Sequence, residues 1–417
     1  MNKDELKRKR VVFIETNFSG LYAIEYCRNQ NYETVLITDS YERFKKWFPA
    51  SALSKLDLVD KIIKVSDSSD VSEVLDVIRS QLINVDALIT FAEIRTKTAA
   101  IVCAELGLKG SNVRAIEIAQ DKYQFRQVLA DKGVEKVECL KLSQAEALDS
   151  LDKRKISFPC FVKPVQGHSS IGASVCQNVA EIRSTMRLLA QTSEDCVSSD
   201  VVIEDYLAGD LLSVEILTIG AGEHQIVGIS DRDIVKQSIE TGASFPLRHS
   251  FRSAIESKAC AALDAIGYDF GASHVELIMT EKGPFLVEIN TRVGGSGHSV
   301  MLDLATSRSI VGDCIELCLG QLNLETTLYH HVQGSAWKSF VYPAGGLIKK
   351  LPSLESIKEK TGVTDVWFHY EEGESLGRLN SNFNWIAQVM CTGVDQLDAK
   401  KNAHAAIDFI AANTVIS

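Results

Sequence analysis

The pattern of expected secondary structure changes near Phe161, and this change constrains the fold more than any other feature of the sequence. Before it, apolar strand segments at 11–15, 35–39 and 87–90 alternate with helical segments at 21–29, 71–82, 94–106 and 113–119. Such alternation predicts a small open parallel α/β sheet. After it, short strands and glycine-containing turns predict an α+β arrangement with antiparallel strands. At 417 residues the chain should divide into several packed units.

Charge and composition exclude several classes of partner. The chain carries 44 Lys and Arg against 55 Asp and Glu, a net charge of -11, which argues against binding to a nucleic-acid backbone or an anionic membrane. The apolar segment after the basic N-terminus is too short for a signal peptide, and no segment reaches transmembrane length. The 10 cysteines are scattered singly. We therefore expect a cytoplasmic protein with no nucleic-acid and no membrane partner.

The strongest chemical signal is a predicted hairpin of the segments 274–280 and 285–290 around the turn Glu-Lys-Gly-Pro. Because side chains alternate along a strand, Glu288, Asn290 and Arg292 share one face, and so do His274 and Glu276. Carboxylate and amide oxygens suit Mg²⁺, and an arginine suits a phosphate. The hairpin thus predicts a magnesium site, although a half-buried hairpin with a polar outer face would have the same composition.

Two cationic positions and a small-residue loop precede the hairpin. Lys163 ends the segment Phe-Val-Lys-Pro-Val, and the loop Gln-Gly-His-Ser-Ser-Ile-Gly-Ala-Ser follows it. Its two glycines, Gly167 and Gly172, permit close approach of the backbone to phosphate oxygens, which predicts a lid. Lys122, at the start of a predicted helix, is a second candidate for phosphate binding. Each feature alone is common, and only their combination indicates a nucleotide site.

The segment Val-Val-Ile-Glu-Asp-Tyr-Leu-Ala-Gly-Asp is the candidate for adenine binding. A segment between two strands offers backbone N–H and C=O groups to the ring, while Leu207 covers an apolar face. Glu204 would accept a hydrogen bond from the adenine amino group.

These motifs together resemble the ATP-grasp superfamily. Lys122, Lys163-Pro, the Ser-Ser-x-Gly loop, Ile-Glu-Asp-Tyr-Leu, and Glu276 with Glu288-x-Asn290-x-Arg292 occur in the superfamily's order across residues 115–319. Within it the chain is most similar to the bacterial L-amino acid ligases, of the dipeptide synthetase type. The resemblance implies a Rossmann-like N-terminal domain at 1–114 followed by α+β ATP-grasp domains. These are a lid subdomain at 115–200, a large subdomain with the metal site at 201–332, and a β-rich C-terminal subdomain at 333–417 packed on the ATP-grasp core.

The resemblance also implies roles for single residues. ATP and Mg²⁺ are the implied cofactors, with Mn²⁺ as an alternative ion. The implied ATP contacts are Lys122, Lys163, Gly167, Ser169, Ser170, Gly172, Glu204, Tyr206, Leu207 and Asp210; the implied metal ligands are Glu276, Glu288 and Asn290. Arg292 would stabilise an acyl-phosphate and His274 would orient the acyl group or assist proton transfer, although a structural histidine is equally compatible. Gly294, Gly295 and Ser296 would contact the substrate or form a flexible strand exit.

One departure concerns the ribose. Relatives commonly carry a glutamate where this chain has Leu211, so Asp210 or Glu215 would have to replace it. The segment 230–249 is the expected substrate loop.

The expected function is ATP-dependent ligation of a small-molecule carboxylate to an amine, with an amino acid as one substrate. Whether the chain forms a homodimer stays open. Two alternatives remain at this point. One is a biotin-carboxylase-like or purine-pathway ligase, and the other is an inactive nucleotide-binding regulatory protein, for which Leu211 is the sequence hint.

Overall fold

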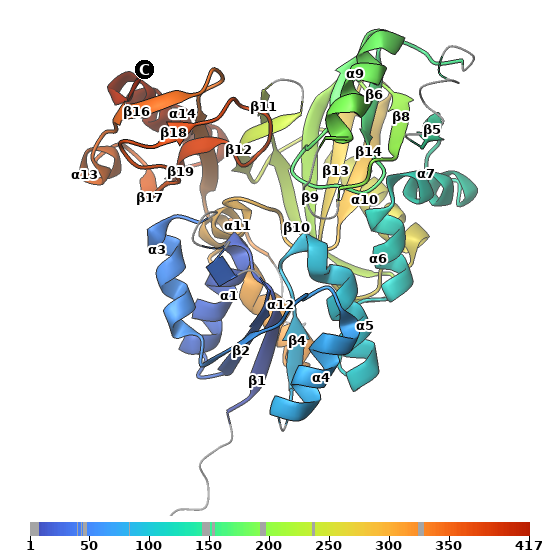
Figure 1. The fold of residues 1–417 in the computed structure, drawn as a ribbon, viewed down its shortest axis with the longest axis vertical. Helices are drawn as coiled ribbons and strands as arrows, with labels where there is room; N and C mark the ends of the chain where they lie inside the picture. The colour runs from blue at the N-terminus through green and yellow to red at the C-terminus, as the bar shows by residue number, and fades with distance from the viewer. Residues whose placement is uncertain are drawn as a thin grey trace, which may run out of the picture.

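The computed structural model describes residues 8–39, 41–42, 44, 48–82, 84–143, 151, 155–191, 197–235, 238–323 and 329–417. Figure 1 shows four units, which we name by their residues. The N-terminal unit (8–112) lies at the bottom, and the central unit (210–231 and 252–290) lies above it. The lid unit (139–205) lies at the upper right, and the C-terminal unit (233–245 and 334–417) at the upper left.

A parallel sheet in the order β3-β2-β1-β4 forms the N-terminal unit, which confirms the predicted α/β fold. Its strands are β1 (Arg10–Ile14), β2 (Glu33–Thr38), β3 (Lys61–Lys64) and β4 (Ala87–Ile89). Its helical segments are α1 (Phe18–Asn29), α3 (Ala50–Leu53), η1 (Ser54–Leu58), α4 (Val71–Gln81), η2 (Glu93–Arg95) and α5 (Thr96–Leu106). The sequence did not predict β3, because only two apolar residues separate its terminal lysines.

The lid unit contains an antiparallel sheet in the order β5-β8-β6-β7, covered by α9 (Val179–Leu189). Its strands are β5 (Cys139–Leu142), β6 (Cys160–Pro164), β7 (Ser174–Cys176) and β8 (Val201–Asp205). Val162 of β6, Ile203 of β8 and Ile182 of α9 share its apolar core. The sheet of the lid unit thus continues past residue 200, where the sequence suggested a boundary.

The central unit is an antiparallel sheet in the order β10-β9-β13-β14. Its strands are β9 (Asp210–Gly220), β10 (Glu223–Asp231), β13 (Gly271–Thr280) and β14 (Gly283–Asn290). One apolar core joins this sheet to three helices, which are α6 (Val113–Gln120), α7 (Lys122–Asp131) and α10 (Arg252–Ile266). The carboxylate of Asp121 accepts the N–H groups of Tyr123 and Gln124, at 3.0 and 2.9 Å, so α7 begins where the sequence predicted a helix start.

The C-terminal unit is built on a sheet in the order β11-β12-β15-β19-β17, with α14 (Gln396–Asn413) packed on it. The strands are β11 (Asp233–Val235), β12 (Ile239–Phe245), β15 (Gly334–Val341), β17 (Val363–Phe368) and β19 (Trp385–Gly393). A small sheet follows, formed by β16 (Gly346–Lys350), β18 (Ser375–Leu376) and β20 (Val415–Ile416), with α13 (Leu354–Lys358) beside β17. Because β12 pairs with β15, the segment 233–245 belongs to the C-terminal sheet.

The largest apolar core is shared between units. It contains Phe13 of β1 and Ile315 of α12 (Ile310–Leu319), together with Trp337 of β15 and Met390 of β19. Helix α11 (His298–Thr306) joins the same core through Met301. The N-terminal, central and C-terminal parts are therefore packed against one another, and the site described below lies where they meet.

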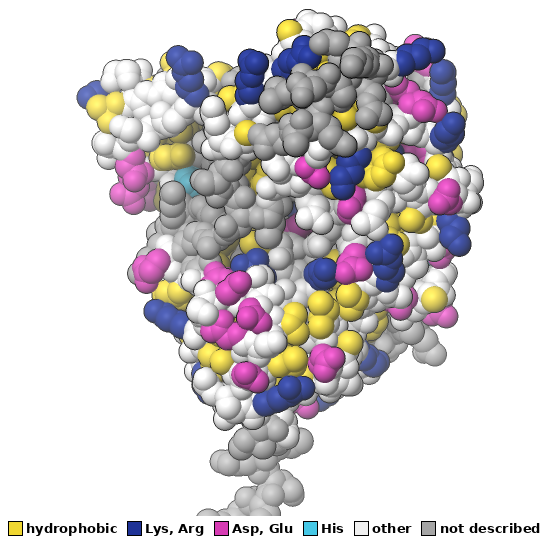
Figure 2. All heavy atoms as spheres, turned by 45° about the vertical axis from the view of Figure 1, so that its right-hand side comes forward, with side chains coloured by type: hydrophobic (Ala, Val, Ile, Leu, Met, Phe, Trp, Pro, Cys, Tyr) yellow, Lys and Arg dark blue, Asp and Glu magenta, His cyan; other side chains and the backbone are white. Residues whose placement is uncertain are grey.

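The surface shows mixed charge. Figure 2 shows basic and acidic side chains interspersed over one face of the molecule. Among the described residues, the structure contains no helix that is both long and apolar enough to cross a membrane.

Candidate functional site

The hairpin β13–β14 presents the predicted polar face. Its register sets His274 opposite Asn290 and Glu276 opposite Glu288, so the predicted pairing of these residues is confirmed. The side-chain amide of Asn290 donates to Glu288 Oε1 at 3.3 Å. The side chains of Glu276 and Glu288 are 19% and 26% exposed, which leaves carboxylate oxygens accessible. Two carboxylates and an amide oxygen on one face form a donor set that fits Mg²⁺.

A cleft of about 400 Å³ adjoins this face. Its lining includes residues of the N-terminal unit, of α7, of the lid unit and of β14, namely Glu93, Lys122, Gly167, His168, Glu288 and Asn290. The ammonium of Lys122 donates to the carbonyl oxygen of Gly167 at 3.2 Å and lies 3.4 Å from Glu288 Oε2. Lys122 therefore stands where the lid loop meets the candidate metal ligands, as a phosphate-binding cation should.

The small-residue loop of the lid unit has a constrained backbone. Ser169, Ser170 and Gly172 all adopt positive φ angles, of 55°, 58° and 72°. For a serine this conformation costs roughly 1–2 kcal/mol, so contacts must hold the loop. Ser170 Oγ donates to the carbonyl oxygen of Ser238 at 2.7 Å, and the N–H of Asn382 donates to that of Ser169 at 3.4 Å. The loop tip thus contacts the C-terminal unit, and its role over the phosphates stays a prediction.

Lys163 and Glu204 form part of a buried ion-pair network. The ammonium of Lys163 lies 3.1 Å from Glu204 Oε2 and donates to the carbonyl oxygen of Val287 at 3.3 Å. Arg126 binds Glu204 through Nε at 2.9 Å and Glu135 through Nη1 at 3.0 Å. Burial disfavours the charged carboxylate of Glu204 and so raises its pKa. The positive charges of Lys163 and Arg126 outweigh this effect of burial and lower the pKa of Glu204 to about 2.

This network changes the expectation for the adenine pocket. Both carboxylate oxygens of Glu204 are bound by Arg126, and one of them also by Lys163. An adenine amino group would therefore have to compete with two buried cations. The sequence missed this because Arg126 precedes Glu204 by 78 residues and lies on the inner face of α7. Tyr206 and Leu207 follow β8, Tyr206 is 41% exposed, and their contact with a nucleotide stays a prediction.

The two candidates for the ribose contact lie in different surroundings. Asp210 is exposed at the start of β9. Glu215 is buried on the same strand, and its carboxylate lies 2.5 Å from Nδ1 of His274. Asp210 is therefore the candidate that remains accessible, whereas Glu215 belongs to the polar cluster around His274.

Arg292 lies at the boundary with the N-terminal unit. Its Nη2 lies 2.5 Å from Glu93 Oε2, and its Nη1 donates to the carbonyl oxygen of Val293 at 2.9 Å. Glu93 lies in η2, and no motif marked it in the sequence. The side chain of Arg292 is 15% exposed, so it is not fully enclosed by these contacts.

The glycine-rich segment after Arg292 leads into α11. A Cβ on Gly294 would lie 2.7 Å from His298 Cγ and 2.9 Å from His274 Nδ1, so only glycine lets the two imidazoles approach the backbone. The carbonyl of Gly295 accepts a hydrogen bond from Nδ1 of His298 at 2.8 Å, and Ser296 has a φ of 51°. The segment is thus an ordered turn that leads into α11, and its contact with substrate stays a prediction.

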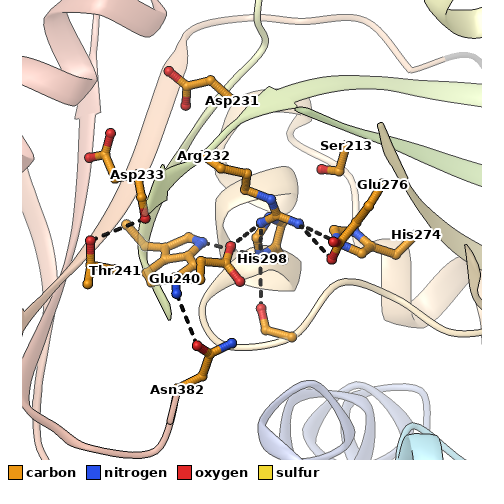
Figure 3. Close-up of polar contacts among 12 residues, drawn as sticks. Ser213, Asp231, Arg232, Asp233, Glu240, Thr241, His274, Glu276, His298 and Asn382 are labelled. Carbon is orange, nitrogen blue, oxygen red and sulfur yellow. Dashed lines mark hydrogen bonds and ion pairs between the residues drawn. The ribbon is translucent and has the colours of Figure 1, made fainter. Parts of the chain in front are cut away.

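A buried polar cluster around Arg232 was not predicted from the sequence. Figure 3 shows the guanidinium of Arg232 between Glu240 on one side and His274 and Glu276 on the other. Arg232 Nη1 binds Glu240 and Nε2 of His298, and Nη2 contacts His274 and lies 3.9 Å from Glu276. Arg232 and Glu240 fall within the predicted substrate loop 230–249, most of whose described residues belong to the end of β10, to β11 and to β12, while 246–249 lie outside any strand.

The pKa values of the two imidazoles in the cluster are shifted in opposite directions. Burial opposes protonation of His274, but Glu215 and Glu276, at 2.5 and 3.3 Å, raise its pKa to about 9. Burial together with the charges of Arg232 and His274 lowers the pKa of His298 well below its usual value. The side chain of His274 is only 3% exposed, and it donates to Glu276, whose pKa is lowered to about 2 despite burial.

Glu215, His274 and His298 also resemble a metal-binding set, because their donor atoms lie within 4.8 Å of one another. The guanidinium of Arg232, however, contacts both imidazoles. A cation already lies among these donors, and we assign no metal to them.

Comparison with known proteins identifies two families that match parts of the chain. Residues 156–300 match the ATP-grasp domain family, and residues 339–415 match the L-amino acid ligase C-terminal domain 2. D-alanine–D-alanine ligase A of Bacillus cereus is 28% identical over 214 residues, which are 48% of this chain and 66% of that protein. Dapdiamide A synthase of Enterobacter agglomerans is 21% identical over 319 residues, which are 72% of this chain and 74% of that protein.

The fold is also similar to a solved L-amino acid ligase. The crystal structure of the enzyme from Bacillus licheniformis superposes with a TM-score of 0.82 at 19% identity, and the match covers 99% of both chains. The two family matches cover the hairpin, the lid loop and most of the C-terminal unit, whereas Glu93 and Lys122 lie before the first match. They identify an ATP-grasp domain at residues 156–300 and an L-amino acid ligase C-terminal domain at residues 339–415, so the chain has the domain composition of an ATP-grasp ligase of the L-amino acid ligase type.

Proposed function

We propose that the enzyme uses ATP with Mg²⁺, or Mn²⁺ as an alternative, to activate the carboxylate of an amino acid and join it to the amine of a second small molecule. The observation that carries this proposal is the position of Glu276. It lies opposite Glu288 on the oxygen-rich face, and it also lies 3.3 Å from His274 in the polar cluster. The oxygen-rich face and the buried polar cluster around Arg232 therefore share one residue, which supports transfer of a phosphoryl group to a carboxylate bound beside them.

The first step is phosphoryl transfer. A carboxylate oxygen of the acid forms a bond to the γ-phosphorus, the bond from that phosphorus to the bridging oxygen breaks, and ADP leaves. Such a step needs positioning and neutralisation of charge rather than a nucleophilic side chain. Lys122 lines the cleft beside Glu288, and the partly exposed side chain of Arg292 supplies a second positive charge.

Glu276, Glu288 and Asn290 would hold Mg²⁺, which when bound offsets the negative charge of the phosphate oxygens. Lys122 lies 3.4 Å from Glu288 and so keeps a cation at the same edge of the site. His274 holds the carboxylate of Glu276 in place through its hydrogen bond.

The second step forms the amide. The amine nitrogen attacks the carbonyl carbon of the acyl-phosphate, the C–N bond forms, the bond to the phosphate oxygen breaks, and phosphate leaves while the amine loses a proton to solvent. The name of the Bacillus cereus relative gives two amino acids as its substrates, which supports an amino acid as the acid here. The family match over residues 339–415 supports the same class.

The test is ADP release from Mg-ATP over pairs of amino acids, with mass spectrometry of the product. We expect ADP when acid and amine are both present, together with a product of amide mass. Hydroxylamine in place of the amine should trap the acyl-phosphate as a hydroxamate. ADP release with bicarbonate alone would favour the carboxylase alternative and contradict the amine ligase, and failure to bind ATP would contradict both.

A further inference from the structure

Strand β14 contains a β-bulge directly before the candidate metal ligand Glu288. Glu288 lies opposite Glu276, and the next pair along the ladder is Leu286 opposite Leu277. Val287 is therefore an extra residue on β14. Bulges of this kind often occur beside functional sites, where they change the direction of a side chain.

The bulge sets the direction of Glu288. Leu286 and Ile289 both belong to the apolar core of the central unit. In a regular strand, residues three positions apart lie on opposite faces, so both can face the core only because Val287 is inserted between them. The same shift turns Glu288 to the polar face, where Asn290 donates to it at 3.3 Å. Loss of the bulge would turn either Leu286 or Glu288 to the wrong face.

Side chains from other parts of the chain bind the backbone of the bulge. The N–H of Leu286 donates to both carboxylate oxygens of Glu135, at 3.2 and 3.1 Å. The carbonyl oxygen of Val287 accepts from the ammonium of Lys163 at 3.3 Å. Because β14 lies at the edge of its sheet, Glu135 and Lys163 hold a backbone that a further strand would otherwise hold.

Arg126 of α7 connects these two side chains. Its Nη1 binds Glu135 at 3.0 Å, and its Nε binds Glu204 at 2.9 Å. Glu204 in turn lies 3.1 Å from Lys163. The side chains of Arg126 and Glu135 are 3% and 2% exposed, so they reach the site through β14 and Lys163 rather than by contact with a ligand.

Glu135 does more than balance the charge of Arg126. An ion pair that served folding alone would need only side-chain partners, whereas both oxygens of Glu135 also bind the main chain of β14. Burial raises the pKa of its carboxyl, and the charges of Arg126 and Lys258, at 3.0 and 3.6 Å, oppose this rise. A charged acceptor binds an N–H group roughly twice as strongly as a neutral one. The carboxylate is therefore suited to keep the bulge in place.

We propose that Glu135 and Arg126 are positioning residues for Glu288. Glu135 fixes the bulge, and Arg126 holds Glu135 in place and aligns Lys163 through Glu204. The proposal rests on the proposed function, in which Glu288 is a ligand of Mg²⁺. Residues that orient the ligands of a metal typically change its affinity by a factor of roughly 10 to 100. Removal of the Glu135 contact should therefore weaken the metal site without altering any of its ligands.

The test is calorimetric titration of ADP into the protein, once with excess Mg²⁺ and once with EDTA. The ratio of the two dissociation constants measures how much the metal contributes to nucleotide binding, and no turnover is needed. The wild-type protein should bind ADP more tightly with Mg²⁺. Glu135→Gln should lower the metal's contribution roughly 10-fold, because a neutral amide holds the N–H of Leu286 less strongly. The dissociation constant of this variant in EDTA should change little.

Two further variants test the contacts separately. Glu135→Asp keeps the charge but withdraws the carboxylate from Leu286, so the metal's contribution should fall here as well. This variant also decides the question if Glu135→Gln does not fold. Arg126→Lys keeps a positive charge but loses the two-pronged contact with Glu204, so it should also weaken ADP binding in EDTA, through the misplaced Lys163.

Controls separate positioning from stability. Asp313 of α12 pairs with Arg308 at 2.6 Å and is 9% exposed, so Asp313→Asn should lower the melting temperature and leave both dissociation constants unchanged. Glu223→Gln alters an exposed carboxylate of β10 and should change neither property. A wild-type ratio in the Glu135 variants, or an equal fall of the ratio in Asp313→Asn, would overturn the proposal alone. A wild-type protein that binds ADP no more tightly with Mg²⁺ than with EDTA would contradict the proposed function as well.

Discussion

At the scale of single residues, charge within the site decides most of the chemistry, and Glu288 is the clearest case. Its carboxylate accepts from Asn290 at 3.3 Å, pairs with Lys122 and is open to the cleft. Glu288→Gln keeps the shape and removes the charge. We expect ADP release to fall about 100-fold or more, because the Mg²⁺ that offsets the charge of the phosphates would lose one of its carboxylate ligands. The melting temperature should stay within a few degrees of the wild-type value.

The measurement is Mg-ATP-dependent ADP release, with a thermal melt for each variant. Glu223→Gln serves again as the control, since Glu223 is exposed and lies outside the site. Unchanged turnover in Glu288→Gln would remove this residue from the metal site.

Asp303 of α11 illustrates a charge outside the site. Burial raises its pKa from 3.8 to about 7, although the N–H of Ile310 donates to it at 2.8 Å. The folded state therefore holds the proton more tightly than the unfolded state. Its contribution to stability is fully present below pH 3.8 and is lost as the pH rises through 7, at about 1.4 kcal/mol for each pKa unit.

Asp303→Asn should remove this pH dependence, because the amide oxygen can still accept from Ile310 and carries no charge. Urea denaturation at pH 5 and at pH 8 measures the free energy of unfolding of both proteins. The variant should be more stable relative to the wild-type protein at pH 8 than at pH 5. An identical gain at both pH values would show that Asp303 is already ionised in the folded protein.

Much of the site at this scale could be predicted from local pattern. The alternation of side chains placed His274, Glu276, Glu288 and Asn290 on one face, and the register confirms it. The partners of Glu204 and Arg292 could not be predicted in this way. Arg126 and Glu93 lie far along the chain, and no spacing rule links them to those residues.

At the scale of secondary-structure elements, close helix packing joins the N-terminal unit to the rest. Gly312 of α12 packs on Tyr26 of α1, and a Cβ at Gly312 would lie 2.4 Å from the tyrosine ring. Gly312→Ala should therefore destabilise the protein by roughly 1–2 kcal/mol, because the overpacking cost exceeds the gain in helix propensity. Urea denaturation measures this change.

Gly377→Ala is the matched control, since nothing lies within 4 Å of a Cβ built there. Its free energy of unfolding should stay within about 0.5 kcal/mol of the wild-type value. A stabilised Gly312→Ala variant would show that α1 and α12 separate easily and that their contact is loose.

The elements that the sequence missed share a physical cause. β3 is a four-residue strand with lysines at both ends, so it carries little apolar signal. β11 and β12 lie in a segment rich in charge that was expected to be a loop, and they become strands because β12 pairs with β15. Strand formation there depends on a partner almost a hundred residues away rather than on local propensity.

At the scale of the whole molecule, one core connects the units, and this predicts cooperative unfolding. Phe13, Ile315, Trp337 and Met390 belong to the same apolar cluster, although they come from three parts of the chain. Unfolding of the C-terminal unit alone would expose this core. We therefore expect a single transition in which all units unfold together.

The tryptophans allow a direct measurement. Trp337, Trp367 and Trp385 all lie in the C-terminal unit, and Trp47 lies outside the described residues. In a Trp47→Phe variant, fluorescence reports on the C-terminal unit and far-ultraviolet circular dichroism on all units. The two urea curves should coincide, and two separated midpoints would contradict the shared core.

The sequence by itself determined most of the elements, their order and the polar face of the hairpin, because strand and helix periodicity, helix capping and motif order are local properties of the chain. Only the tertiary structure decided which of those residues meet. The pairing of Glu93 with Arg292, the enclosure of Glu204 by two cations and the cluster of Arg232, Glu240 and His298 arise where separate elements pack. Burial then sets their charge states, since the cost of removing a charge from water depends on every neighbour rather than on the residue alone.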